Sequence, residues 1–179
     1  MTERIIHRLA ERPNRAIAEA IESLAVAELI EPGKRFVVVS PWISDFPIID
    51  NRGGEFSSLD STWTATRVTF SSFLRSLLRR GVRVLVACGQ GRSEIDFIER
   101  VRSGSVQDGT SDLLTLRVSE FDSSRLLEHE KALVSDEWVV HGSMNLTYRG
   151  VEVNGEIVTI SSDSAHVAEL TTTIMELFA

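Results

Sequence analysis

The chain has 179 residues, of which 42% are hydrophobic and 25% are charged, a composition typical of one folded domain rather than of a disordered or fibrous chain. Its net charge of −7 argues against a protein that coats nucleic acid through a broad basic surface, so any contact with phosphates must be local. Cys88 is the one cysteine, which excludes an internal disulfide and a cysteine-based zinc site.

The N-terminal segment is interrupted by charged residues every few positions, unlike a secretory signal, which needs an unbroken apolar stretch. No stretch of the sequence approaches the run of about 18 apolar residues that a membrane-spanning helix needs. We therefore expect a cytoplasmic protein without stable membrane insertion.

The first 40 residues predict two helices followed by a strand. Apolar side chains at helical spacing over residues 3–30 predict a short helix, a break near Pro13 and a longer helix. We expect residues 1–32 to form a helical segment packed on a domain that covers residues 33–179. The β-branched run at residues 35–40 (RFVVVS) predicts a strand buried on both faces.

The remaining elements alternate between strands and helices. Residues 42–62 show no sustained period and predict a long loop. A helix over 66–80 and a strand over 82–88 complete a β-α-β unit, which favours parallel strands. The pattern predicts an α/β fold with a mixed sheet flanked by helices, whose further elements are a helix (93–102), a polar turn (103–112), a strand (113–119), a hairpin (131–135 and 139–142), a strand (156–160) and a final helix (164–178).

Four polar side chains sit at the ends of the predicted hairpin. His129 and Lys131 are two residues apart, so alternation along a strand places them on the same face. Ser143 and Asn145 have the same spacing at the far end. Lys131 is one of only two lysines beside 17 arginines, which indicates a place that favours a compact ammonium. An imidazole, an ammonium, a hydroxyl and a carboxamide together suit the chemistry of a phosphodiester.

These residues form the pattern HxKxxxxD followed by GSxN, which resembles the signature of the phospholipase D superfamily. Five residues separate the aspartate from the glycine, one fewer than is usual in that family. Glu156 stands eleven residues after the asparagine, where relatives commonly carry a glutamate that orients the histidine. The resemblance implies a phospholipase-D-like mixed sheet in one domain per chain, with the signature at His129, Lys131, Asp136, Gly142, Ser143 and Asn145.

The resemblance also implies a mechanism and a partner. His129 would attack phosphorus without a metal or cofactor, with Lys131, Asp136 and Glu156 as further catalytic residues. Lys131, Ser143 and Asn145 would bind the substrate phosphate. The family mechanism needs a second histidine as the acid, and no other histidine has an HxK context. We therefore expect a homodimer that shares one site, since the remaining histidines are His7, His141 and His166.

Three functions stay open at this point. The resemblance favours a nuclease-like phosphodiesterase acting on DNA or RNA, of the kind that accompanies bacterial DNA-modification or phage-defence systems. A lipid or small-molecule phosphodiesterase is the second candidate, and a non-catalytic subunit that binds nucleic acid or a partner protein is the third. Trp42 and Asp45 follow the first strand, where they either line the cleft or pack the loop.

Overall fold

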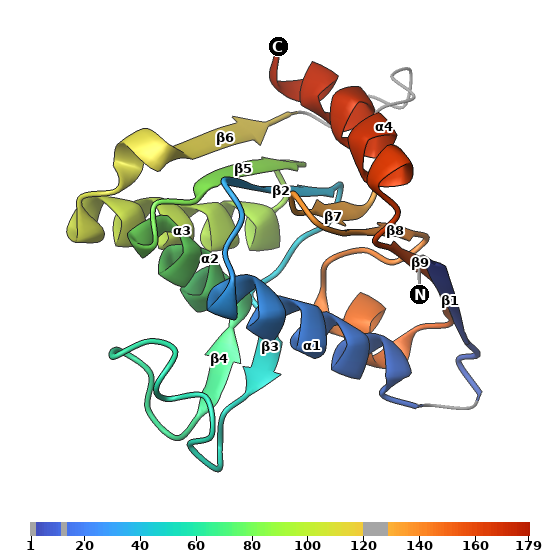
Figure 1. Ribbon diagram of the computed structural model, residues 1–179, viewed down its shortest axis with the longest axis horizontal. Helices are drawn as coiled ribbons and strands as arrows, with labels where there is room; N and C mark the ends of the chain where they lie inside the picture. The colour runs from blue at the N-terminus through green and yellow to red at the C-terminus, as the bar shows by residue number, and fades with distance from the viewer. Residues whose placement is uncertain (1–2, 12–13, 120–128) are drawn as a thin grey trace.

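The computed structural model describes residues 3–11, 14–119 and 129–179, and it alternates strands and helices along the chain (Figure 1). The strands are β1 (Glu3–Arg8), β2 (Arg35–Ser40), β3 (Pro47–Asp50), β4 (Arg67–Thr69), β5 (Arg83–Cys88), β6 (Leu114–Val118), β7 (Ala132–Val134), β8 (Val139–Gly142) and β9 (Glu156–Ser161). The α-helices are α1 (Ala16–Ile30), α2 (Phe70–Arg79), α3 (Arg92–Asp108) and α4 (Ser164–Met175).

One mixed sheet organises the described part of the chain. Its strand order is β1-β9-β8-β7-β2-β5-β6, while β3 and β4 form a separate two-stranded ribbon. Strands β2, β5 and β6 run parallel, and β7, β8, β9 and β1 add to β2 in antiparallel fashion. The predicted parallel pair and the predicted hairpin thus belong to the same sheet, where β2 pairs with β7.

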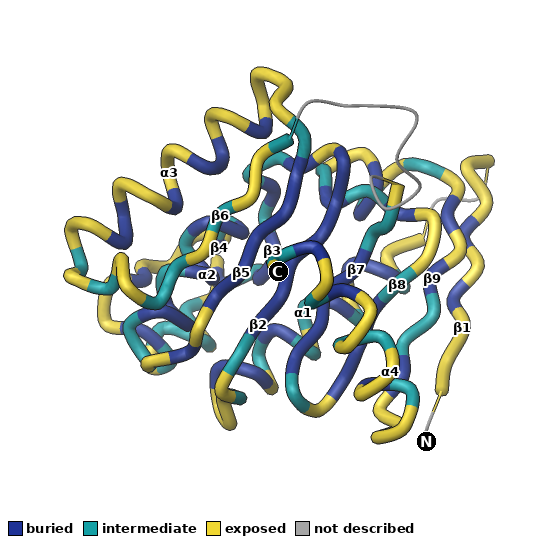
Figure 2. Tube along the Cα trace, turned by 90° about the horizontal axis from the view of Figure 1, so that it is seen from above, coloured by how far each residue is buried: buried dark blue, intermediate teal, exposed yellow. Residues whose placement is uncertain are grey.

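Helices cover both faces of the sheet. Helices α1, α2 and α3 pack on one face and α4 on the other (Figure 1). Strand β2 is buried on both sides because Phe36 and Val38 join the larger core while Val37 and Val39 join the core under α4. The central strands are accordingly dark in Figure 2, whereas exposed residues appear along β1 and α3. Within the described residues, no helix is long and apolar enough to cross a membrane.

The mixed α/β fold is confirmed, and several elements lie where the sequence predicts them. Strand β5 and the hairpin of β7 and β8 match their predicted ranges closely. The turn of the hairpin is held by Ser135, whose hydroxyl accepts hydrogen bonds from the backbone N–H of Glu137 and Trp138 at 3.0 and 3.1 Å. Asp163 caps α4 by accepting from the backbone N–H of His166.

The predicted helix at the N-terminus is wrong for residues 3–8, which form edge strand β1. The burial alternates there, with Ile6 and Arg8 inside and Ile5 and His7 exposed, because the strand pairs with β9. In such a short segment the apolar residues fit both a strand and a helix. Pairing with β9, far away in the sequence, therefore decides that the segment is a strand. Among the described residues of segment 1–32, only α1 is helical, and β1 shares the sheet with residues after 32.

Three further boundaries differ from the prediction. Helix α3 continues through much of the predicted polar turn and ends at Gly109, whose φ of 68° suits glycine. The predicted long loop contains strand β3, and the predicted helix at residue 66 begins with strand β4. A short π-helix occupies Arg149–Val153, between the predicted hairpin and the predicted strand at 156–160, where the sequence predicts no helix. The bounds of these elements depend on packing against the rest of the chain, which local propensity does not describe.

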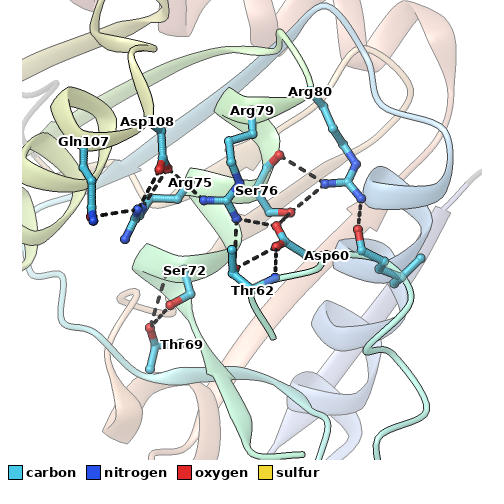
Figure 3. A network of polar contacts seen from close by, with 11 residues as sticks. Asp60, Thr62, Thr69, Ser72, Arg75, Ser76, Arg79, Arg80, Gln107 and Asp108 are labelled. Carbon is cyan, nitrogen blue, oxygen red and sulfur yellow. Dashed lines mark hydrogen bonds and ion pairs between the residues drawn. The ribbon is translucent and has the colours of Figure 1, made fainter. Parts of the chain in front are cut away.

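A polar network fastens the segment after β3 to α2 and α3 (Figure 3). Asp60 is 7% exposed and accepts hydrogen bonds from the Ser76 hydroxyl at 2.5 Å and from the Thr62 hydroxyl at 2.7 Å, and it pairs with Arg79. Arg79 also pairs with Asp108 of α3 at 2.8 Å. Burial acts to raise the pKa of Asp60, but hydrogen bonds from Ser76, Thr62 and Arg79 outweigh it and hold that pKa well below its usual range.

We predict that Asp60→Asn lowers the free energy of unfolding by about 2 kcal/mol, because charge-assisted hydrogen bonds at a buried carboxylate are lost. Denaturant unfolding followed by circular dichroism measures this change. Arg52→Ala is the matched control, since Arg52 pairs with Asp50 but its side chain is 63% exposed, and we expect no measurable change there. Equal losses in the two variants would contradict the proposed importance of the network.

Candidate active site

Four strand ends meet at one edge of the sheet, where all the predicted site residues except Asp136 lie. Strands β2 and β8 end at this edge, while β7 and β9 begin there. The pairing of Gly142 with Val158 sets Ser143 opposite the start of β9. The site therefore lies at the carboxyl end of β2, where open α/β sheets usually bind ligands.

His129 and Lys131 lie side by side ahead of β7. The Lys131 Nζ atom is 3.3 Å from Nδ1 of His129, so the two side chains lie close together as expected, although neither residue belongs to a strand. Lys131 also donates to the backbone carbonyl of His129. Burial lowers the pKa of the Lys131 ammonium, and the carboxylate of Glu156 acts in the opposite direction. Lys131 thus places a partly desolvated cationic group beside an exposed imidazole.

Ser143 and Glu156 form the second half of the site. The Ser143 hydroxyl donates to Oε2 of Glu156 at 2.5 Å and accepts from the backbone N–H of Ile157 at 3.0 Å. Glu156 is only 8% exposed. Ser143 therefore holds a buried carboxylate in place, and it would bind a phosphate only by turning its hydroxyl away from Glu156. The predicted orientation of His129 by Glu156 stays a prediction.

Asn145 lies two residues farther along the same loop. Its Oδ1 atom is buried and has no hydrogen-bond partner within the described part of the chain. A buried amide oxygen is costly to leave unpaired, so this side chain is poised to bind a ligand or water. Its predicted contact with a substrate phosphate would come from the amide nitrogen of the same side chain.

Gly142 allows the strand to pass into this loop. Its φ is 150°, and a Cβ atom at this position would lie 2.2 Å from the carbonyl oxygen of Ile157. No other residue type meets both conditions, because a side chain would separate β8 from β9. The glycine of the motif thus sets the close approach that lets Ser143 reach Glu156.

Two buried polar residues that the sequence did not single out support the loop. The Ser40 hydroxyl at the end of β2 accepts from the backbone N–H of Leu146 at 3.1 Å. Arg8 is fully buried in β1, and its guanidinium donates to the backbone carbonyls of Gly150, Val151 and Asn154. An arginine in a short N-terminal segment gives no sign of such distant partners, so only the tertiary contacts reveal its role.

The two residues left open after the first strand have different roles. Asp45 accepts hydrogen bonds from the backbone N–H and the hydroxyl of Ser71, both at 2.9 Å, and so packs the loop against α2. Trp42 instead reaches the site, since its ring centroid lies 6.1 Å from that of His129 in an edge-to-face arrangement. In residues 3–11, 14–119 and 129–179, no group of three His, Cys, Asp or Glu side chains is arranged to hold a metal ion.

The family model described as the cardiolipin synthase, PLD-like domain matches residues 59–178. The chain belongs to the phospholipase D superfamily. No curated protein sequence is significantly similar to it. The phospholipase D fold is also evident from similar solved structures, although their sequence identity is low.

Nuc from Salmonella typhimurium, a phospholipase D family member, has 14% identity and a TM-score of 0.62, with 99% of this chain and 93% of Nuc covered. Phosphatidylserine synthase from Haemophilus influenzae has 14% identity and a TM-score of 0.64, with 98% of this chain and 38% of that chain covered. TrmBL2, an archaeal chromatin protein that binds DNA, has 15% identity and a TM-score of 0.51, with 99% of this chain and 52% of TrmBL2 covered.

The aspartate of the phospholipase D motif lies apart from the other motif residues. Asp136 follows the end of β7 and contacts the start of β2, where it accepts from the backbone N–H of Lys34 at 2.6 Å and pairs with Arg35 at 3.4 Å. His129 and Lys131 precede the start of β7, at the opposite edge of the sheet. Asp136 thus lies at the other end of β7 from His129 and Lys131 and contacts the start of β2, and its catalytic role stays a prediction.

We predict that Asp136→Ala leaves the turnover number within about twofold of wild type but lowers the free energy of unfolding by about 1 kcal/mol, the usual cost of a lost hydrogen bond. Lys131→Ala is the comparison, and there we expect turnover to fall by at least about a hundredfold, as for the loss of a transition-state donor. Steady-state rates and denaturant unfolding measure the two effects. A turnover loss as large as that of Lys131→Ala, with unchanged stability, would support the catalytic role of Asp136 that the motif predicts.

Proposed function

We propose that this protein is a metal-independent phosphodiesterase that cleaves nucleic acid through a phosphohistidine at His129. The observation that carries the proposal is the cluster at one sheet edge, where an exposed imidazole lies 3.3 Å from the ammonium of Lys131. The carboxylate of Glu156, which accepts a hydrogen bond from Ser143, raises the pKa of that ammonium against the effect of burial. A nitrogen nucleophile with an adjacent cation can attack a phosphodiester without help from a metal ion.

The reaction has two steps in this proposal. A ring nitrogen of His129 forms a bond to phosphorus while the bond from phosphorus to the leaving oxygen breaks, and an acid protonates that oxygen. Water then attacks the phosphohistidine and gives a proton to the group that acted as the acid, the P–N bond breaks and the histidine is regenerated. Lys131 balances charge on the non-bridging oxygens, Asn145 donates a hydrogen bond to one of them, and Glu156 stabilises the charged histidine.

The acid in this scheme is His129 of a second chain. The other three histidines lie on the α4 side of the sheet: His141 pairs with Ala132, whose side chain joins the core under α4, His166 belongs to α4, and His7 alternates with the inward Ile6. Lys131 has the opposite alternation and lies with Leu133 toward the larger core. Two copies facing each other across a two-fold axis would supply both histidines.

Nucleic acid is the substrate class that we favour. The similarity to a DNA-binding chromatin protein supports it, while the similarity to phosphatidylserine synthase keeps a lipid headgroup as the competing substrate. The net charge of −7 places the interaction at the site rather than over a broad surface.

The test is a panel of single-stranded DNA, duplex DNA, RNA, bis-p-nitrophenyl phosphate and phosphatidylcholine vesicles, each assayed in excess EDTA. We expect cleavage of a nucleic acid that His129→Ala abolishes and that the exposed-histidine control His7→Ala retains. Acid quench during turnover should leave phosphate on His129. Loss of activity in EDTA with recovery in magnesium would contradict the mechanism. Cleavage of lipid alone would show that the substrate is a lipid and not a nucleic acid. An inactive wild type would favour a non-catalytic binding subunit.

We also predict how activity depends on chain composition when wild-type and His129→Ala chains exchange. If both histidines are needed in one site, only doubly wild-type dimers work, and activity follows the square of the wild-type fraction. Light scattering on the mixtures confirms that the variant still dimerises. A linear dependence after demonstrated exchange, or full activity in a monomer, would show that each chain carries a complete site.

A further inference from the structure

One tryptophan differs from the other two in its exposure. Trp63 and Trp138 are 9% and 7% exposed and belong to the larger core, whereas Trp42 is 44% exposed. Burying a large aromatic ring is strongly favourable, so the exposed part of this indole, beside a site, can contribute apolar surface to a ligand with a flat face.

The backbone around this indole is firmly held. The Ser40 hydroxyl donates to the carbonyl of Trp42 at 2.7 Å, and the next residue, Ile43, donates its N–H to the buried carboxylate of Glu94 at 3.2 Å. Ile43 also forms an isolated β-bridge with Leu146, in the segment after β8 that carries Ser143 and Asn145 (the motif loop). Because the main chain is fixed on both sides, a ligand that binds the indole orders little else, which lowers the entropic cost of binding.

The indole is also fixed relative to the nucleophile. Its ring lies 6.1 Å from the His129 ring at an interplanar angle of 86°. The edge-to-face contact engages one ring with the other and positions both, while 44% of Trp42 remains accessible to solvent. A group stacked on the indole would therefore belong to a part of the substrate that is bonded to the phosphate at His129 or lies next to it along the chain.

We propose that Trp42 is a stacking surface for the base of the nucleotide next to the scissile phosphodiester, an inference that rests on the proposed nuclease function. Every base has a π-face, so this contact binds nucleic acid without selecting a sequence. A base paired within a duplex is already stacked on its neighbours, so the contact selects single-stranded nucleic acid. A phospholipid has no flat ring to place there.

The test compares cleavage of a single-stranded oligonucleotide with that of the same oligonucleotide carrying abasic nucleotides on both sides of the cleaved linkage. In the wild type, removing the bases should raise KM roughly 5- to 100-fold, the range for one base–aromatic stack, with a smaller change in kcat. In Trp42→Ala, KM for the intact strand should rise by a similar factor and the difference between the two substrates should vanish. Trp42→Phe should retain part of it.

Tyr148→Ala is the matched control, because Tyr148 is the other strongly exposed aromatic ring in the described residues and lines a separate cavity of about 270 Å³ beside α1 and β3. It should keep the full difference between the intact and abasic substrates. In a His129→Asn background, oligothymidylate should quench the tryptophan fluorescence, and Trp42→Phe should remove that quenching.

The outcomes separate this inference from the proposed function. If the wild type cleaves no nucleic acid, the proposed function fails and the stacking surface with it. If the wild type cleaves nucleic acid but Trp42→Ala keeps the same abasic penalty, the nuclease stands and this inference is wrong. A further outcome is that the Trp42→Ala protein dissociates into monomers on gel filtration. If its KM equals the wild-type KM at concentrations that restore the dimer, the indole belongs to the subunit contact instead.

Discussion

The antiparallel hairpin of β7 and β8, inserted between β2 and β9, is the constraint on which the rest of this structure depends. Hydrogen bonds on both sides fix its register, with Val39 opposite Ala132 and Gly142 opposite Val158. Because a slip of one residue would turn every side chain to the other face, the two cores allow only this register. Residues before β7 and after β8 are thereby held at the same edge.

The burial of the hairpin explains how the polar groups of the site are held in place. Ala132 and Val134 face the core under α4, while Leu133 and Val140 face the larger core. Such a strand has little freedom to move, so the side chains that follow it are positioned at low entropic cost. The polar groups that leave the core at this edge find partners in distant segments, above all Arg8 in β1 and Ser40 in β2.

The two ends of the hairpin have different physical roles. At one end, His129 is exposed beside a partly desolvated lysine, and a buried amide oxygen on Asn145 lacks a partner within the described residues. At the other end, Asp136 and Ser135 satisfy backbone N–H groups of the neighbouring segments. Unsatisfied groups and perturbed charges are typical of functional sites, whereas satisfied ones stabilise the fold.

The sequence by itself determined the α/β class, the buried strands β2 and β5, the hairpin and the identity of the motif residues, because these depend on local periodicity and on spacing along one hairpin. It could not determine that residues 3–8 form an edge strand, that Arg8 supports the motif loop, that Asp136 lies apart from His129 or that Trp42 reaches it. Each of these depends on a partner far away in the chain. Local pattern carries no information on such pairings, and only the closing of the sheet decided them.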